Sequence, residues 1–305
     1  MDKMDKTDNN VIKTVKLTKH YGKIEALSDL TVNIAENSIT GLIGRNGSGK
    51  TTLLKILAGI LDKTSGEAAV FGGQPMDNLP VLNRLVYAYH NMVYQTNLKL
   101  RDILFAYKTM FPNFDPVFAD KLMKYFELTG KMKYKSLSQG MGSMFNFLCA
   151  LSCRAELTML DEPVLGMDVT ARKSAYEILL RDFSEHPRTF IISSHLLSEI
   201  EGMLTDILLI EQGTPVLHNS IDDVRQSAYR VDGGGTEIEK YTAGKKIIAQ
   251  KTNELTNFAV IYEPLTEKAA ESAKVQGLTV SAVRAEDLCV YLTRQNKEGE
   301  LECLW

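Results

Sequence analysis

Hydrophobic residues along the first two thirds of the chain fall into short runs separated by segments with helical spacing. Apolar residues dominate the runs at 38–43, 157–160 and 189–193, and a helix is predicted over 169–184 between the last two. Strands without polar alternation are typical of a parallel sheet buried on both faces. The alternation of strand and helix therefore predicts an α/β fold whose parallel sheet is covered on both sides.

Other segments show a different periodicity. Residues 30–34 alternate apolar and polar side chains, 11–17 do so loosely, and a strand over 67–71 ends at a Gly-Gly turn. Such alternation is typical of half-exposed antiparallel strands. From about 98 to 155 the spacing is helical, with breaks at two prolines and at 140–142. We therefore expect antiparallel strands and a helical region beside the parallel sheet.

The last part of the chain is predicted to be separate. The sequence Val-Asp-Gly-Gly-Gly at 231–235 is typical of a linker. Beyond it, strands are predicted over 246–249, 258–262 and 279–283, and helices over 266–275 and 285–294. We predict a disordered stretch over 1–10, a main domain over 11–226 and an α+β accessory domain over 227–305.

Composition narrows the class of protein. The 305 residues carry a net charge of −3, which gives no basic field for nucleic acid, so no nucleic-acid partner is expected. No run of about eighteen apolar residues occurs, so no segment is expected to span a bilayer. The four cysteines lack metal-ligand spacing, which favours reduced, buried thiols in a cytosolic chain.

The sequence Gly-Arg-Asn-Gly-Ser-Gly-Lys-Thr at 44–51 fits the phosphate-binding loop pattern G-x-x-x-x-G-K-[ST], and Thr52 extends it. A strand, a glycine turn and a helix start aim backbone N–H groups and a helix dipole at one anion. Lys50 would reach the β- and γ-phosphates, and the Thr51 hydroxyl would hold Mg²⁺. The alternative, a glycine-rich turn with an incidental lysine, leaves these flanking patterns unexplained, so the loop predicts nucleotide binding.

Two carboxylates and a histidine form a second group. Asp161 and Glu162 follow the strand at 157–160, and His195 follows the strand at 189–193. At the end of a strand, Asp161 could hold Mg²⁺ directly or through water, and Glu162 could act as general base on a water molecule. An Asp-Glu pair alone is more often a helix start, but its place downstream of Lys50 favours a site.

Taken together, these motifs resemble those of the ATP-binding subunits of ABC transporters, over roughly residues 11–225. The resemblance identifies Walker A at 44–52, the signature at 137–141, Walker B with its glutamate at 157–162, and the D-loop at 166–168. It implies an α/β P-loop NTPase (RecA-like) core with an antiparallel β subdomain, a helical signature subdomain at about 91–155 and a C-terminal α+β appendage. Within the family, the chain resembles the drug- and antibiotic-exporter branch, and more narrowly ATPases of the bacterial response to cell-wall antibiotics.

The resemblance also implies roles for individual residues. Tyr21 would stack on adenine, Glu162 would be the catalytic base, and His195 would contact the γ-phosphate. Thr51 and Asp161 would hold Mg²⁺. Ser138 and the Gly140 N–H would complete the site of a second ATPase subunit, identical or different, because they cannot fold back onto their own Lys50. The nucleotide phosphates would be bound by Gly44, Asn46, Gly47, Ser48, Gly49, Lys50, Thr51 and Thr52.

The chain departs from the family pattern at two places. Where the family has a glutamine that contacts Mg²⁺ and water, gapless alignment places His90, with Gln95 as the alternative. The helix after the signature, 142–151, is largely apolar and lacks the usual Gln and Arg residues. A helix that faces the core explains this composition. A weakened signature that favours pairing with a different ATPase subunit is the alternative.

The resemblance implies an enzyme that hydrolyses MgATP and powers export through a separate transmembrane permease. The chain would then lie at the cytoplasmic face of the cell membrane as a peripheral subunit. One alternative is a soluble nucleotide switch of the same superfamily, although the chain has one such domain and no sustained heptads. A P-loop small-molecule kinase is another, although 98–151 contains no arginine-rich lid. The transported molecule cannot be read from this chain.

Overall fold

The computed structural model describes residues 9–95, 97–252 and 257–293. It divides into two compact units, one made of residues 1–195 and 202–215 and the other of 196–201 and 216–305. The predicted disordered stretch 1–10 falls largely on residues outside the described ranges, and the first strand begins at Asn10. The predicted boundary at 226–227 stays a prediction.

A parallel sheet forms the centre of the first unit, with strand order β9-β4-β8-β7-β6. Its register aligns Asp161 with Tyr89 on one neighbouring strand and with Ser193 on the other, at the carboxyl edge of the sheet. The strands are β4 (Ile39–Ile43), β6 (Leu85–Tyr89), β7 (Leu157–Asp161), β8 (Thr189–Ser194) and β9 (Asp206–Glu211).

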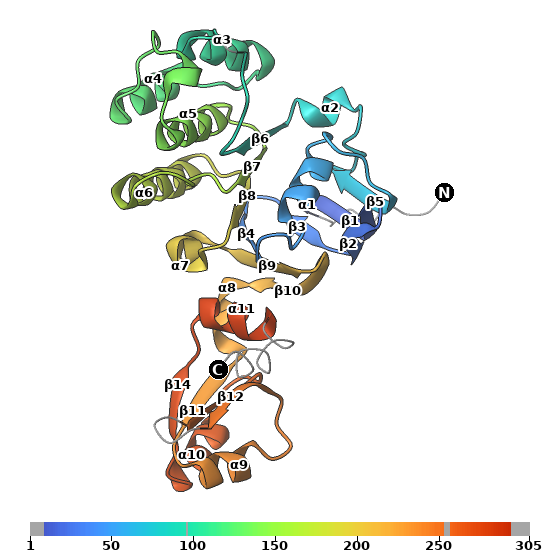
Figure 1. Cartoon of the computed structure of the whole chain (residues 1–305), viewed down its shortest axis with the longest axis vertical. Helices are drawn as coiled ribbons and strands as arrows, with labels where there is room; N and C mark the ends of the chain where they lie inside the picture. Colours follow the sequence, from blue (N-terminus) through green and yellow to red (C-terminus); the bar gives the residue numbers. More distant parts are fainter. Residues whose placement is uncertain (1–8, 96, 253–256, 294–305) are drawn as a thin grey trace. The chain divides into compact units, whose positions relative to one another are not determined.

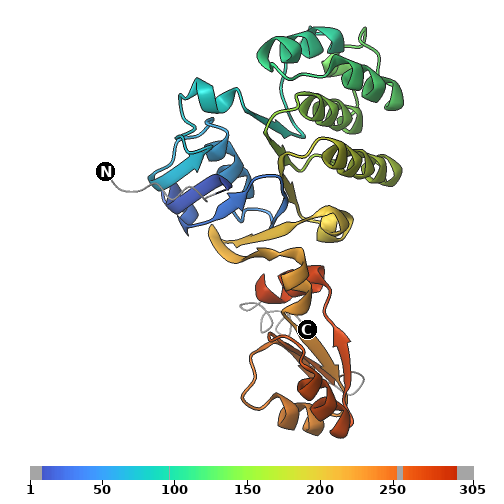
Figure 2. The ribbon, with the colours of Figure 1, turned by 180° about the vertical axis from the view of Figure 1, so that it is seen from behind.

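Both faces of this sheet are covered, as the apolar strands predict. Helices α5 (Gln139–Ser152) and α6 (Val169–Glu185) lie on one side, and α1 (Lys50–Leu57) lies on the other (Figures 1 and 2). The remaining helices of the unit are α2 (Leu79–Leu82), α3 (Leu100–Met110), α4 (Pro116–Tyr125) and the 3-10 turns η1 (Tyr134–Ser136) and η2 (Glu201–Met203), the last of which straddles the division. Asp115, Ser138 and Asp168 cap α4, α5 and α6 through their side-chain oxygens.

The antiparallel sheet contains β1 (Asn10–Tyr21), β2 (Ile24–Leu30), β3 (Asn33–Ala35) and β5 (Ser65–Val70), with β1 paired to the other three. The single strand predicted over 30–34 is wrong, because β2 ends at Leu30 and β3 begins at Asn33. The buried Thr14 hydroxyl donates to the Leu30 carbonyl and accepts from the Val32 N–H, each at 3.0 Å. These side-chain hydrogen bonds supplement the backbone bond from the Thr14 N–H to the Val32 carbonyl oxygen, 2.8 Å, at the bend.

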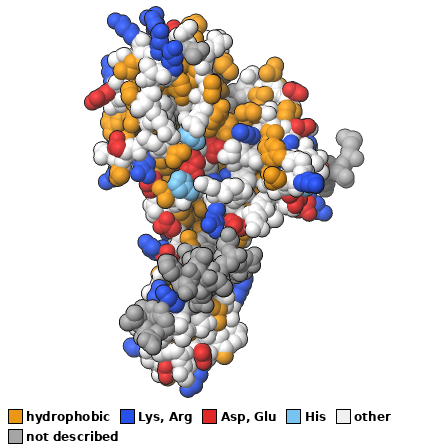
Figure 3. All heavy atoms as spheres, viewed as in Figure 1, with side chains coloured by type: hydrophobic (Ala, Val, Ile, Leu, Met, Phe, Trp, Pro, Cys, Tyr) orange, Lys and Arg blue, Asp and Glu red, His pale blue; other side chains and the backbone are white. Residues whose placement is uncertain are grey.

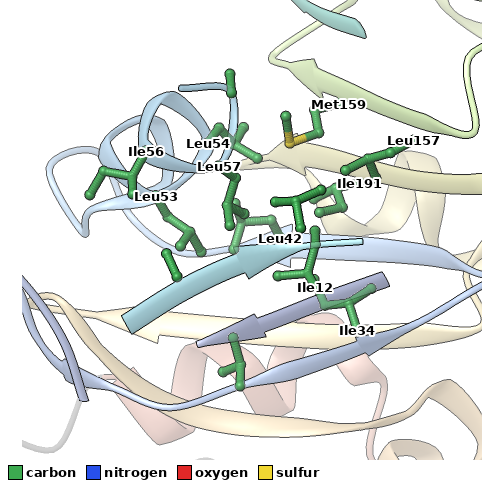
Figure 4. Packing of buried hydrophobic residues seen from close by; sticks show 14 of the residues in the cluster. Ile12, Ile34, Leu42, Leu53, Leu54, Ile56, Leu57, Leu157, Met159 and Ile191 are labelled. Carbon is green, nitrogen blue, oxygen red and sulfur yellow. The ribbon is translucent and has the colours of Figure 1, made fainter. Parts of the chain in front are cut away.

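A hydrophobic core joins α1 to both sheets. Leu53, Leu54 and Leu57 of α1 meet Ile12 of the antiparallel sheet and Met159 of the parallel sheet (Figure 4). Burying one side chain of this size stabilises the fold by roughly 1.5–3 kcal/mol. The core therefore fixes the start of α1 relative to the carboxyl edge of the parallel sheet.

The second unit contains an antiparallel sheet of order β12-β13-β11-β14. The predicted linker at 231–235 is wrong, because Val231 is fully buried in β11, which pairs with strands on both sides. The glycines of that segment instead turn the chain from β11 into α9. The elements are α7 (Leu197–Ile200), β10 (Thr214–Ser220, whose first residues belong to the first unit), α8 (Ile221–Gln226), β11 (Tyr229–Asp232), α9 (Gly235–Thr242), β12 (Ile247–Thr252), β13 (Asn257–Ile261), α10 (Glu267–Val275), β14 (Thr279–Ala282) and α11 (Ala285–Thr293).

Charged side chains of both signs are spread over the visible face of the first unit, and basic side chains gather at its helical end (Figure 3). Within the described ranges, no helix combines the length and apolar character needed to cross a bilayer.

Candidate active site

The phosphate-binding loop joins the end of β4 to the start of α1. Gly49 caps α1 with φ at 108°, in the region that favours glycine. A Cβ atom built on Gly49 would lie 2.6 Å from the Ala26 carbonyl oxygen, so a side chain does not fit there. The first N–H groups of α1 have no partner within the helix, so this end is suited to an anion.

Lys50 is buried at the start of α1. Its Nζ donates to the carbonyl oxygens of Gly44 at 2.7 Å and Arg45 at 3.1 Å. Burial lowers the pKa of Lys50, and the nearby Glu162 and Asp161 carboxylates oppose that shift. The ammonium group is thus held over the loop by backbone oxygens that a phosphate could replace.

A cavity of about 320 Å³ opens beside the loop. Its walls bring together the two predicted acids and the predicted phosphate-binding residues other than Gly44. It is lined by Ala26, Asn46, Gly47, Ser48, Gly49, Lys50, Thr51, Thr52, Asp161 and Glu162.

Three hydroxyl groups hold the Asp161 carboxylate. Thr51 Oγ1 donates to Oδ2 at 2.7 Å, Tyr87 donates to the same oxygen at 3.1 Å, and Ser193 Oγ donates to Oδ1 at 2.5 Å. Burial and the neighbouring Asp161 raise the pKa of Tyr87, so it remains a hydroxyl donor. Sequence reasoning missed Tyr87 and Ser193, although their places on the strands next to β7 were a usable signal.

The structure also brings Glu162 and His195 together. His195 Nδ1 lies 2.9 Å from Glu162 Oε2, and the side chains are 43% and 19% exposed, respectively. The Glu162 backbone has φ at 49°, and its N–H donates to Ser193 Oγ at 3.0 Å. This turn directs a partly exposed carboxylate toward the cavity, beside an imidazole. A carboxylate in that position can accept a proton from water.

The donor set fits a nucleotide and a hard cation. The buried ammonium of Lys50 and the start of α1 suit phosphate, while the adjacent Thr51 hydroxyl and Asp161 carboxylate are oxygen ligands of the kind Mg²⁺ accepts. Among the described residues, no cluster of three or more His, Cys, Asp or Glu side chains forms a metal site. A cation here would therefore need phosphate oxygens or water as further ligands.

The signature residues lie outside this cavity. Ser138 caps α5 by accepting from the Met141 N–H at 3.3 Å, and its side chain is exposed. A Cβ on Gly140 would lie 2.5 Å from the Gly166 carbonyl oxygen, so glycine is required where α5 passes the D-loop segment. Neither residue lines the cavity that contains Lys50, so the two predicted groups of anion-binding atoms lie apart in the protomer.

Four further predicted residues also lie outside the cavity lining: Tyr21, Gly44, His90 and His195. Tyr21 is 46% exposed at the end of β1, with the Lys19 ammonium 5.3 Å from its ring centroid. His90 is half-buried and directly follows β6, next to the strand that ends in Asp161. Gln95 is exposed. These positions do not decide which of the two residues takes the place of the family's glutamine, and experiment can.

The apolar helix after the signature faces the core, as its composition predicts. Phe145, Phe147, Leu148, Ala150 and Leu151 are all buried on α5. The buried thiols Cys149 and Cys153 are free, and burial raises the pKa of both.

The fold and this loop define a P-loop NTPase. A family model described as "ABC transporter" matches residues 27–165. The bacitracin transport ATP-binding protein BcrA of Bacillus licheniformis is 31% identical over 208 residues, which cover 67% of this chain and 68% of that protein. The lantibiotic transport ATP-binding protein SrtF of Streptococcus pyogenes is 30% identical over 223 residues, which cover 70% and 92%. The chain therefore belongs to the ATP-binding proteins of the ABC transporter family.

Three other similar proteins extend this result. The uncharacterized ABC transporter ATP-binding protein YcbN of Bacillus subtilis is 28% identical over 293 residues, 91% of this chain and 92% of that protein. A solved ATP-binding subunit of an ABC transporter superposes with a TM-score of 0.62 at 22% identity, covering 70% of this chain and 92% of that chain. The dimeric cassette MJ0796 bound to ADP and Pi superposes with a TM-score of 0.60 at 19% identity, covering 69% and 98%. These neighbours confirm the predicted fold class.

Proposed function

We propose that this chain hydrolyses MgATP and powers export through a separate transmembrane permease, at the cytoplasmic face of the membrane. The observation that carries the proposal is the cavity in which Lys50, Asp161 and Glu162 face the same space. An ammonium, a cation-binding carboxylate and a general base are the groups that phosphoryl transfer to water requires. The transport names of BcrA and SrtF support the export part.

Each residue has a proposed task in this reaction. Residues 44–52 bind the phosphates, and Tyr21 stacks on adenine. Glu162 takes the proton of the attacking water, and His195, 2.9 Å from its carboxylate, orients that base and contacts the γ-phosphate. Thr51 and Asp161 hold Mg²⁺, which would neutralise phosphate charge when bound.

We further propose that the working unit is a dimer of ATPase subunits. Ser138 and Gly140 lie at the N-terminus of α5, outside the cavity of their own Lys50, so they are available to the nucleotide of a second subunit. Enclosing ATP between Lys50 of one subunit and Ser138 of the other would close the dimer. Hydrolysis and phosphate release would open it.

Purification from solubilised membranes tests the function. The full chain should copurify with a transmembrane polypeptide, and the complex should hydrolyse ATP at a rate that Glu162→Gln reduces by about 100-fold or more. A chain that copurifies with ribosomes or DNA, and with no membrane protein, would instead support the soluble-switch alternative. ATP turnover of the chain alone, compared with turnover after adding a second ATPase subunit, distinguishes a homodimer from an obligate heterodimer.

A further inference from the structure

One polar side chain interrupts the buried apolar face of α5. Asn146 is 2% exposed and lies between Phe145 and Phe147, both fully buried or nearly so. Burying an amide without hydrogen bonds costs free energy of a few kcal/mol, about 1–3 by mutational measures. The contacts that satisfy Asn146 therefore indicate what this position does.

The Asn146 amide bonds to two separate segments that both precede α5 in the sequence. Its Nδ2 donates to the Tyr89 carbonyl oxygen at 3.2 Å and to the Tyr134 hydroxyl at 3.0 Å. Its Oδ1 accepts from the Tyr94 hydroxyl at 3.3 Å. Tyr89 directly precedes His90, and Tyr134 begins the turn that leads to Ser138.

Aromatic contacts tighten the same cluster. The Tyr94 and Tyr134 rings meet edge to face with centroids 4.5 Å apart. The Tyr94 hydroxyl lies 3.1 Å from the Tyr107 hydroxyl on α3. Burial raises the pKa of all three tyrosines, so they stay protonated and able to donate. The Tyr94 hydroxyl has one proton, which can be donated to Asn146 Oδ1 or to Met92 Sδ at 3.6 Å, and in either case the Tyr107 hydroxyl can donate to Tyr94.

We propose that Asn146 is a positioning residue for Ser138. With the hydroxyls of Tyr94, Tyr107 and Tyr134, it holds the segment 89–94, the middle of α5 and the turn that precedes Ser138 as one unit. Because α5 is a continuous helix capped by Ser138, displacement of 89–94 moves the helix tip that binds the second subunit's nucleotide. This inference rests on the proposed role of Ser138.

Hydrogen exchange of the full chain tests the coupling without requiring a dimer. Tyr94→Phe should accelerate amide exchange over 137–142 by about fivefold or more, although the change lies in another segment. In Asn146→Leu the same region should already exchange faster, and adding Tyr94→Phe should produce no further change. Tyr125→Phe on α4 is the matched control, because that ring is 59% exposed and lies outside the cluster.

Two results would overturn the inference. One is unchanged exchange over 137–142 in Tyr94→Phe, and the other is an equal acceleration by Tyr94→Phe with and without Asn146. The thermal unfolding midpoint of each variant separates local loosening from general instability. If Asn146→Leu does not fold, the single variants Tyr94→Phe and Tyr134→Phe test the inference instead. Tyr94→Phe should accelerate exchange over 137–142, and Tyr134→Phe should accelerate exchange over 89–94.

Measuring ATP-dependent dimerisation separates this inference from the proposal that the subunits dimerise. In a Glu162→Gln chain, Tyr94→Phe should raise the ATP concentration for half-maximal dimerisation by about fivefold, with fluorescent-nucleotide binding to the monomer unchanged. If Glu162→Gln without Tyr94→Phe never dimerises, even with the permease and a second ATPase subunit present, the proposed dimer fails, and the exchange result still decides the role of Asn146. A Tyr94→Phe chain that dimerises at the same ATP concentration as its parent would contradict the role.

Discussion

Among individual residues, the Asp161 side chain has the most hydrogen bonds in the site. Its carboxylate accepts from the hydroxyl groups of Thr51 on α1, Tyr87 on β6 and Ser193 on β8. Thr51 is expected to turn to the cation when it binds, which leaves Tyr87 and Ser193 to orient the carboxylate. A hydrogen bond to a charged group contributes about 1.5–3 kcal/mol. These two side chains should therefore keep the Asp161 carboxylate in the orientation that binds Mg²⁺.

Tyr87→Phe and Ser193→Ala should each raise the Mg²⁺ concentration for half-maximal ATP turnover by about tenfold, since each removes one such bond. Nucleotide binding measured without Mg²⁺ should change little. Thr158→Val is the control, because its buried hydroxyl lies on the same strand but contacts no group of the site that we describe. If the two variants, the Thr158→Val control and the unmodified chain all need the same Mg²⁺ concentration, the Asp161 carboxylate does not depend on these hydrogen bonds.

His90 and Gln95 compete for one role, and turnover of the assembled complex separates them. If His90 contacts the metal-bound water, His90→Ala should lower ATP turnover by about 10-fold or more, and Gln95→Ala should not. The reverse pattern would assign the role to Gln95. If ATP turnover and its coupling to transport are unchanged in both variants, neither His90 nor Gln95 contacts the metal-bound water.

At the element scale, a buried charge cluster joins the end of α5 to α6. Asp182 is 2% exposed in its side chain and contacts Arg154 and Arg188, the latter at 2.6 Å. Arg188 Nη2 also donates to the Leu151 carbonyl oxygen at 3.2 Å. Removing a partner from a buried ion pair leaves an uncompensated charge.

Asp182→Ala should therefore lower the free energy of unfolding by about 3–5 kcal/mol, measured by urea denaturation. Glu156→Gln is the comparison, because Glu156 pairs with Arg84 while both side chains are about half exposed, at 51% and 44%. That change should cost less than about 1 kcal/mol. Similar losses in the two variants would contradict the assignment of Asp182 as the buried centre of the cluster.

Elements with strong periodicity were predictable from sequence, and those set by tertiary contacts were not. The apolar strand at 157–160 and the helix over 169–184 match β7 and α6 closely. The bend between β2 and β3 was missed because it depends on the Thr14 hydroxyl, which is distant in sequence. Asn146 was likewise unremarkable in an apolar helix until its partners on other segments were known.

At the scale of the whole molecule, the helix that follows His195 belongs to the second unit. Leu197 and Ile200 of α7 are buried, Ser198 donates to Glu286 of α11 at 3.2 Å, and α11 also packs on α8. The glycines at 233–235 suggested a linker because composition alone does not reveal that Val231 pairs with strands on both sides.

Truncation tests how firmly this unit holds α7. A chain that ends at residue 226 lacks α11, exposes Leu197 and Ile200, and should have a thermal unfolding midpoint several degrees lower, about 2–4 °C per kcal/mol lost. If the truncated chain matches the full-length midpoint, α11 does not stabilise α7.

The motifs of the site could be predicted from the residues themselves. That two protomers contribute different groups to one nucleotide was an expectation from family resemblance. Lys50 and Ser138 lie in different parts of one chain, and only a second subunit would bring such groups to one nucleotide. The proposed closure of two subunits around ATP, and with it the roles of Ser138 and Gly140, depends on this shared enclosure.

Sedimentation of Glu162→Gln with MgATP tests this enclosure, with the permease complex present if the chain alone stays monomeric. We expect an ATP-dependent dimer of ATPase subunits that dissociates when ATP is removed and is weakened by Ser138→Ala. Subunits that stay separate with saturating ATP, even beside their permease, would contradict it.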